Sequence, residues 1–110
     1  MWRISLLDSK AKPYALPAEK VQLQTKYTVI TAPIRFSEVF NFEGLLNDKE
    51  AKDTLTVLNG FIDRWATVPP YNSDPFAPTL GNVKVLISRM LVFAHLYPDG
   101  LWYIVKAVGE

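Results

Sequence analysis

The 110-residue chain contains no cysteine, so disulfide bonds, thiolate catalysis and cysteine-ligated zinc or iron–sulfur sites are all excluded. Its five glycines are isolated from one another, and neither a Walker A sequence nor a GxGxxG motif occurs. These absences argue against P-loop and dinucleotide-binding enzymes, and we expect no bound cofactor.

Long apolar runs and an excess of charge of one sign are also absent. No run approaches the roughly 18 residues that a membrane span needs, and Arg3 and Asp8 interrupt the short apolar patch at the start. We therefore expect no transmembrane segment, no signal peptide and a location in the cytoplasm or a virion. The 12 basic and 11 acidic side chains are well mixed, which argues against strong binding of duplex nucleic acid.

What is present fits a globular protein. Hydrophobic residues make up 49% of the chain and charged residues 21%, an ordinary balance for a folded domain. At this length, residues 1–110 are expected to form a single domain with a real hydrophobic core.

The first half of the chain predicts strands. Residues 2–8 alternate with a period of two, and residues 21–31 read as a half-exposed strand. The expected buried face of the second strand consists of Val21, Leu23, Tyr27 and Val29. Residues 34–46 are ambiguous, because three phenylalanines alternate as in a strand whereas Ser37 suits the cap of a short helical turn. We favour a short strand or an irregular stretch that delivers aromatic side chains to the core.

Residues 47–66 predict a helix. Asn47 suits the N-cap position, with Glu50 three residues later as in a capping box. The spacing of four, three, four and three residues defines one apolar face, formed by Ala51, Leu55, Leu58, Ile62 and Trp65. The Asn59-Gly60 pair supports two alternatives, a type I′ hairpin or a helix that ends there. We favour the helix because length, cap and apolar face agree.

Residues 83–96 and 101–108 predict a long C-terminal hairpin, joined by a turn with Pro98, Asp99 and Gly100. Both of its strands are apolar on two faces, so both faces should be covered. The expected class is α+β, with a mainly antiparallel sheet of four or five strands, one principal helix and this hairpin. Three strands, a helix and two strands is also the element order of an OB-fold.

Few residues suggest chemistry. His95 is the only histidine, and although Asp99 follows four residues later, no nucleophile accompanies the pair. Asp63, Asn72 and Asp74 offer oxygen atoms but do not match the spacing of a calcium loop. We therefore expect no catalytic residue, no metal site, no small-molecule ligand and no enzymatic activity.

The segment VPPYNSDPFAPTLGN, residues 68–82 (the proline-rich segment), carries four of the eight prolines together with Tyr71 and Phe76. Its prolines favour an extended and ordered loop over a flexible linker. We expect it to present its aromatic side chains to the chain's own sheet or to a neighbour.

Association is the function that these features favour. The candidate partner-binding residues are Tyr71, Phe76, Trp102, Tyr103 and, more weakly, Trp2. We predict a non-enzymatic structural or assembly subunit that acts through protein–protein contacts with a partner or in a homo-oligomer, a description that fits a small viral or phage component. One alternative is an OB-like module for single-stranded nucleic acid, which the charge balance does not support. The other is a small enzyme or regulator of unknown chemistry.

Overall fold

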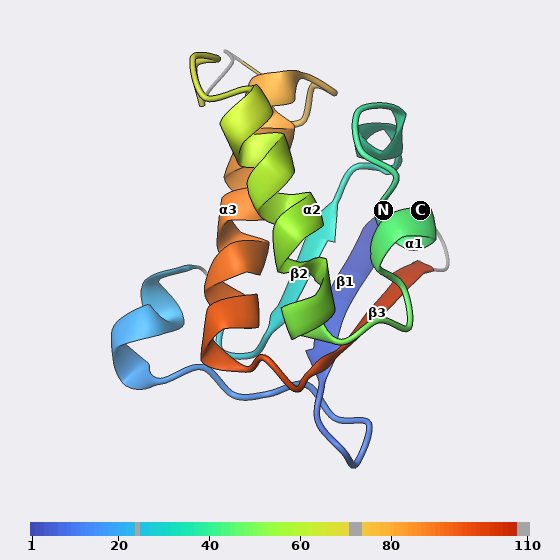
Figure 1. Ribbon diagram of the computed structural model, residues 1–110, viewed down its shortest axis with the longest axis vertical. Coiled ribbons are helices and arrows are strands. Elements are labelled where there is room, and N and C mark those ends of the chain that lie inside the picture. The colour runs from blue at the N-terminus through green and yellow to red at the C-terminus, as the bar shows by residue number, and fades with distance from the viewer. Residues whose placement is uncertain (24, 71–73, 108–110) are drawn as a thin grey trace.

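The computed structural model describes residues 1–23, 25–70 and 74–107, arranged as a sheet with helices on one of its faces (Figure 1). Two long helices lie side by side across the sheet. In chain order the elements are β1 (Trp2–Leu7), the 3-10 helix η1 (Ala18–Leu23), β2 (Val29–Ala32), the 3-10 helix η2 (Ile34–Glu38), α1 (Phe42–Leu46), α2 (Ala51–Arg64), α3 (Leu80–Leu96) and β3 (Leu101–Lys106).

The sheet has the strand order β2-β1-β3, and β1 runs antiparallel to both neighbours. Ile4 lies opposite Ile30 on one side and opposite Ile104 on the other. The α+β class is therefore confirmed. The expected four or five strands are wrong, since the described residues form a three-stranded sheet, and two long helices replace the one principal helix.

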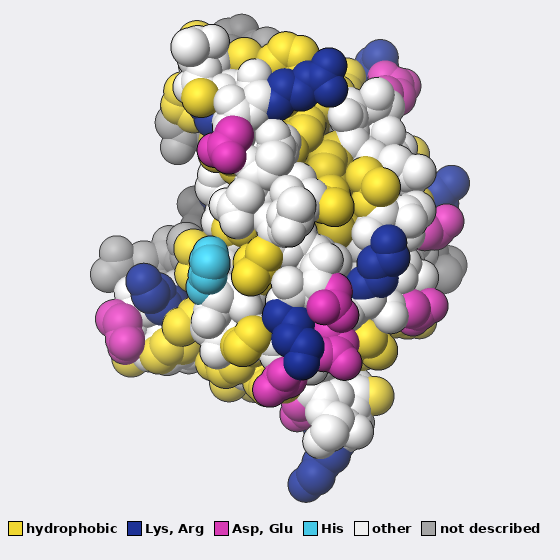
Figure 2. Space-filling view, viewed as in Figure 1, with side chains coloured by type: hydrophobic (Ala, Val, Ile, Leu, Met, Phe, Trp, Pro, Cys, Tyr) yellow, Lys and Arg dark blue, Asp and Glu magenta, His cyan; other side chains and the backbone are white. Residues whose placement is uncertain are grey.

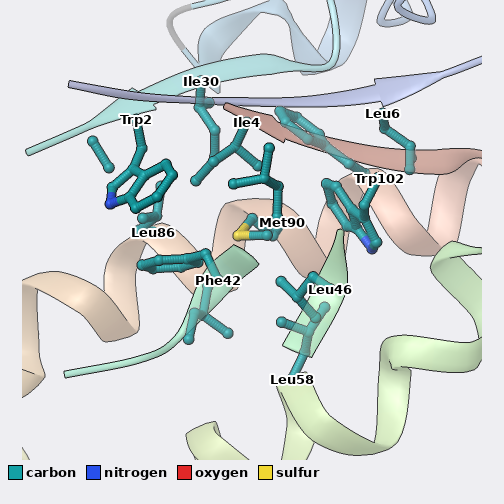
Figure 3. Packing of buried hydrophobic residues seen from close by; sticks show 14 of the residues in the cluster. Trp2, Ile4, Leu6, Ile30, Phe42, Leu46, Leu58, Leu86, Met90 and Trp102 are labelled. Atoms are coloured by element: carbon teal, nitrogen blue, oxygen red, sulfur yellow. The ribbon is translucent and has the colours of Figure 1, made fainter. Parts of the chain in front are cut away.

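The core lies between the sheet and the helices (Figure 3). Strand side chains alternate between two faces, so every second residue of β1 and β3 points toward the helices. Full burial of each large apolar side chain contributes about 1.5–3 kcal/mol. The cluster includes Trp2, Ile4, Leu6, Ile30, Phe42, Leu46, Leu58, Leu86, Met90 and Trp102.

Residues 83–96 are helical, so the predicted C-terminal hairpin is wrong. The apolar side chains of α3 that are buried recur at helical spacing, on one side of the helix. They are Val83, Leu86, Ile87, Met90, Phe93 and Ala94. Branched side chains prefer strands only weakly, and here the tertiary packing of α3 overrides that preference. Within the described ranges, no helix is both long and apolar enough to cross a membrane.

Both ends of α3 have local causes. The helix begins at a side-chain cap, because Thr79 Oγ1 accepts a hydrogen bond from the Asn82 backbone N–H at 3.2 Å. It ends before Pro98, where the Gly100 N–H donates to the Tyr97 carbonyl at 3.0 Å. The turn predicted at these residues is therefore present, but it joins a helix to β3.

The predicted strand at 21–31 is mostly wrong. Its first residues belong to η1, and only Val29–Ala32 form β2. The buried face is also shifted by one residue: Thr28, Ile30 and Ala32 are buried, whereas Tyr27 is exposed. Thr28 fits inside because its hydroxyl donates to the Leu6 carbonyl at 2.8 Å.

Residues 34–46 form η2 and α1, so the favoured strand or irregular stretch is wrong. The expected delivery of aromatic side chains is confirmed, because Phe36, Phe40 and Phe42 are all buried. Asn41 caps α1, accepting from the Gly44 N–H at 3.0 Å. Ser37 is not that cap, since its hydroxyl donates to the Ile34 carbonyl.

The predicted helix at 47–66 is confirmed as α2, which continues through Asn59 and Gly60 to Arg64. Neither the hairpin nor an early end at Gly60 is observed. The expected capping box is wrong, because the helix begins one turn later, with Glu50 at the N-cap and no side-chain cap bond. Asn47 instead ends α1.

Candidate partner-binding groove

The two edges of the sheet differ. Along β3, the Asn47 Oδ1 accepts from the Ile104 N–H at 2.9 Å, and the Trp102 N–H and carbonyl bond to the backbones of Lys49 and Asp48. Residues 47–49 therefore cover that edge. Strand β2 pairs with β1 alone among the described segments. No described segment pairs with its other edge, although the Val29 N–H already donates to the Tyr27 carbonyl at 2.7 Å.

A groove of about 550 Å³ lies next to the open edge of β2. One side of the groove is lined by Val29, Ile30 and Thr31 of β2, and Met1 and Thr25 also line it. The opposite wall comes from α3, which runs in the direction opposite to β2 (Figure 1). The α3 residues that line the groove, spaced three, one and three apart as on a single helical face, are Asn82, Val85, Leu86 and Arg89.

Pro75 and Phe76 of the proline-rich segment line the same groove, and Pro33 and Phe36 also contribute. Phe76 is 64% exposed, the largest exposed fraction among the bulky apolar side chains of the described residues. The sequence-based prediction placed Phe76 at a surface, and the structure places it at the rim of a hollow.

The described part of the proline-rich segment is fixed by hydrogen bonds to α3. The Asn82 Nδ2 donates to the carbonyls of Asp74 and Ala77, each at 2.9 Å. The Asp74 carboxylate accepts from the Phe76 N–H at 2.9 Å, which holds the backbone next to this aromatic side chain. The loop is thus tied to the first turn of its own helix, while Tyr71 lies outside the described residues.

A second set of hydrogen bonds joins residues 66–68, where the proline-rich segment begins, to the second turn of α3. The Lys84 Nζ donates to the carbonyls of Ala66 and Val68, each at 3.0 Å. Gly81 packs so closely against the Pro69 carbonyl that a side chain at that position would collide with it. The interpretation of an ordered loop thus fits the described residues.

Arg89 is the one charged side chain among the described residues that line the groove. It is half-buried, and within residues 1–23, 25–70 and 74–107 it makes no ion pair or hydrogen bond through its guanidinium. A partly desolvated cation that lacks an ion-pair partner favours an anionic partner in this groove.

Trp2 and Trp102, both predicted to bind a partner, lie in the core of the chain itself. The Trp102 side chain is fully buried, and its Nε1 donates to the Thr54 Oγ1 at 2.9 Å. The Trp2 Nε1 donates to the Ile34 carbonyl at 3.2 Å, and the side chain is 5% exposed. The fold itself thus accounts for both indoles.

Tyr103 lies on the outer face of the sheet, which the helices do not cover. It is 46% exposed and stands next to Ser5, with Val29 on the other side of that serine. Leu101 is exposed on the same face. Tyr103 and Phe76 thus belong to separate surfaces, one on the sheet face and one at the groove.

His95 is exposed on the last turn of α3, and Asp99, the carboxylate considered with it, contacts Lys52 instead. The Asp99 carboxylate accepts from the Lys52 Nζ at 3.2 Å, and Lys52 also contacts Glu50 at 3.1 Å. Both carboxylates raise the pKa of Lys52, Glu50 more strongly than Asp99. In the part of the chain that the structure describes, no group of His, Asp or Glu side chains could hold a metal ion.

The element order that suggested an OB-fold is not observed, because α3 replaces its fourth strand. On the helical face, basic and acidic side chains are interspersed and form no basic stripe (Figure 2). The sequence-based prediction did not identify Val85, Leu86 and Arg89 as groove residues, because it placed them in a strand. Their spacing on one helical face was the available signal.

Comparisons with models of protein families, with curated proteins and with solved structures found no match to this chain.

Proposed function

We propose that this chain is a non-enzymatic subunit that acts through protein–protein contacts, with the groove between β2 and α3 as its main contact surface. The observation that carries the proposal is the exposed Phe76 side chain, whose backbone is held by hydrogen bonds next to a groove with both apolar and polar walls. A viral or phage setting stays a prediction.

Phe76 has the properties of an interface anchor. Burial of an exposed phenylalanine against a partner contributes about 1.5–3 kcal/mol. Ordering a loop on binding opposes that gain, but here Asp74 and Asn82 already fix the backbone around Phe76. Phenylalanine is among the residues enriched at interfaces, and a side chain that is already held in place loses less entropy on binding.

Site-specific photo-crosslinking tests the proposal. A benzophenone-bearing amino acid replaces Phe76 in the full chain, expressed in the organism that encodes it, and the matched control carries the same group in place of Val57. Val57 is also exposed but lies on α2 and does not line the groove. We expect a discrete crosslinked product of higher mass from position 76 and not from position 57.

The partner in that product is identified by mass spectrometry, and a second copy of the chain is an admissible partner. Equal crosslinking at both positions, or none at position 76, contradicts the proposal.

A further inference from the structure

We propose that the groove binds an extended segment of a partner protein, which pairs with the open edge of β2 as a fourth strand and places an acidic side chain on Arg89. This inference rests on the proposed function and names the chemistry of the partner. It follows from three features of the groove: its strand edge, its length and its one charged side chain.

The strand edge favours an extended occupant. Exposed edges of sheets bind peptides by backbone pairing, and adjacent pockets then select alternate side chains. Residues 47–49 cover the outer edge of β3, whereas no described segment pairs with the outer edge of β2. The groove that follows this edge therefore suits an extended peptide, whose backbone N–H and C=O groups can form hydrogen bonds with the backbone of β2.

The length of the groove fits three or four extended residues. The helical wall runs from Asn82 to Arg89, a rise of about 10 Å at about 1.5 Å per residue. The four residues of β2, Val29–Ala32, cover about 10 Å at about 3.3 Å per residue. Both walls thus extend over the same distance.

The spacing of the wall predicts a sequence pattern. Val85 and Arg89 are about 6 Å apart along the axis of α3, and alternate side chains on a strand are about 6.6 Å apart. A strand that lies along β2 therefore directs one side chain toward Val85 and the next on that face toward Arg89. The pattern that fits is an apolar residue and an acidic residue with one residue between them.

The carboxylate belongs to a side chain and not to a chain end. Capture of a terminal carboxylate uses a nest of free backbone N–H groups. Arg89 lies in the third turn of α3, where the backbone N–H groups bond within the helix. An Asp or Glu side chain needs the guanidinium alone, which can hold it with two parallel hydrogen bonds.

Peptide titrations monitored by amide NMR on the full chain test the inference. The probe is Ac-TVTETVT-NH2, whose Val, Glu and Val side chains share one face and so fit either chain direction. We expect changes in amide chemical shift that are confined to β2 and to the α3 residues that line the groove. The Glu peptide should bind with an affinity about tenfold higher than that of the matched peptide Ac-TVTQTVT-NH2.

Two variants separate the contributions of Arg89 and Phe76 to peptide binding. In Arg89→Gln the two peptides should bind equally, because the partner of the carboxylate is gone. In Phe76→Ser both peptides should weaken by a similar factor, and the preference for Glu should remain. N-methylation of one alternate set of peptide amides should abolish binding, and N-methylation of the other set should have little effect.

Three results overturn the inference. The first is equal binding of the Glu and Gln peptides to the unaltered chain, and the second is that TVTQTVT with a free carboxyl end binds more tightly than the Glu peptide. The third is that light scattering shows a dimer and that the NMR signals of the groove residues are lost on dimerisation. The last two assign the site to a terminal carboxylate or to a second copy. If crosslinking from position 76 succeeds while the peptides fail, the proposed function stands and this inference falls.

Discussion

Replacement of Gly60 with alanine distinguishes the helix from the hairpin at residues 54–65. Gly60 lies in the third turn of α2, is exposed, and has nothing within 4 Å of the position that a Cβ would occupy. In a helix interior alanine is about 0.8–1.0 kcal/mol more favourable than glycine. Only one turn of α2 follows this position, so we expect the free energy of unfolding to rise by about 0.5–1 kcal/mol.

The measurement is urea unfolding followed by far-ultraviolet circular dichroism, with the midpoint and slope fitted for both proteins. In a type I′ turn, Gly60 would need a positive φ, and alanine there would destabilise the fold by a similar or larger amount. The sign of the change is therefore decisive, and a loss of stability would refute the helical assignment.

Gly100→Ala is the matched control. A Cβ at this position would lie 2.6 Å from Cγ of Leu6, a fully buried side chain of the central strand. Overpacking of this kind typically costs about 1–3 kcal/mol. The same substitution should therefore stabilise the chain at one glycine and destabilise it at the other.

Three further predictions concern single hydrogen-bonded groups. Thr54→Val leaves the buried Trp102 indole N–H without its acceptor, so urea unfolding should show a loss of about 1–3 kcal/mol, and an unchanged midpoint would argue against this bond. Asn82→Ala removes both side-chain bonds to the loop, so hydrogen exchange of the Phe76 amide should accelerate while that of β1 does not; equal protection would contradict this role. The backbone N–H groups of Lys12 and Lys10 lower the pKa of the Asp8 carboxyl, so its contribution to stability is present above the unfolded-state pKa and is lost as pH falls through the lower folded value. An NMR titration should give a midpoint below the usual range for aspartate, and an ordinary midpoint would disprove the contact.

The sequence predicted elements well where local signals agreed. Residues 2–8 and 101–108 show strand patterns, and α2 has an apolar face at helical spacing, so all three were assigned correctly. Helix α3 was not predicted because apolar residues occur on most of its sides. One side packs against α2, another faces the sheet, and a third lines the groove. A helix that is apolar on most sides loses the contrast between faces that identifies a helix from sequence.

The candidate site could be predicted only in part. Phe76 was identified because aromatic residues between prolines suggest an ordered, exposed loop. The groove was not, because it joins β2 to α3, which are far apart in the chain and are brought together only by tertiary packing. Composition alone also cannot separate a buried tryptophan from an interface tryptophan, which is why Trp102 was misplaced at a surface.

The central position of β1 has a consequence for the order of events during synthesis. Among the strands that the structure describes, β1 precedes β3 by about 100 residues and yet pairs with it, since Ile4 lies opposite Ile104. Long-range pairing of this kind raises the contact order and slows folding. Until Lys106 has emerged, β1 can pair with β2 alone, and its other edge lacks a partner strand. Chaperones would have the most exposed apolar surface to bind during this period.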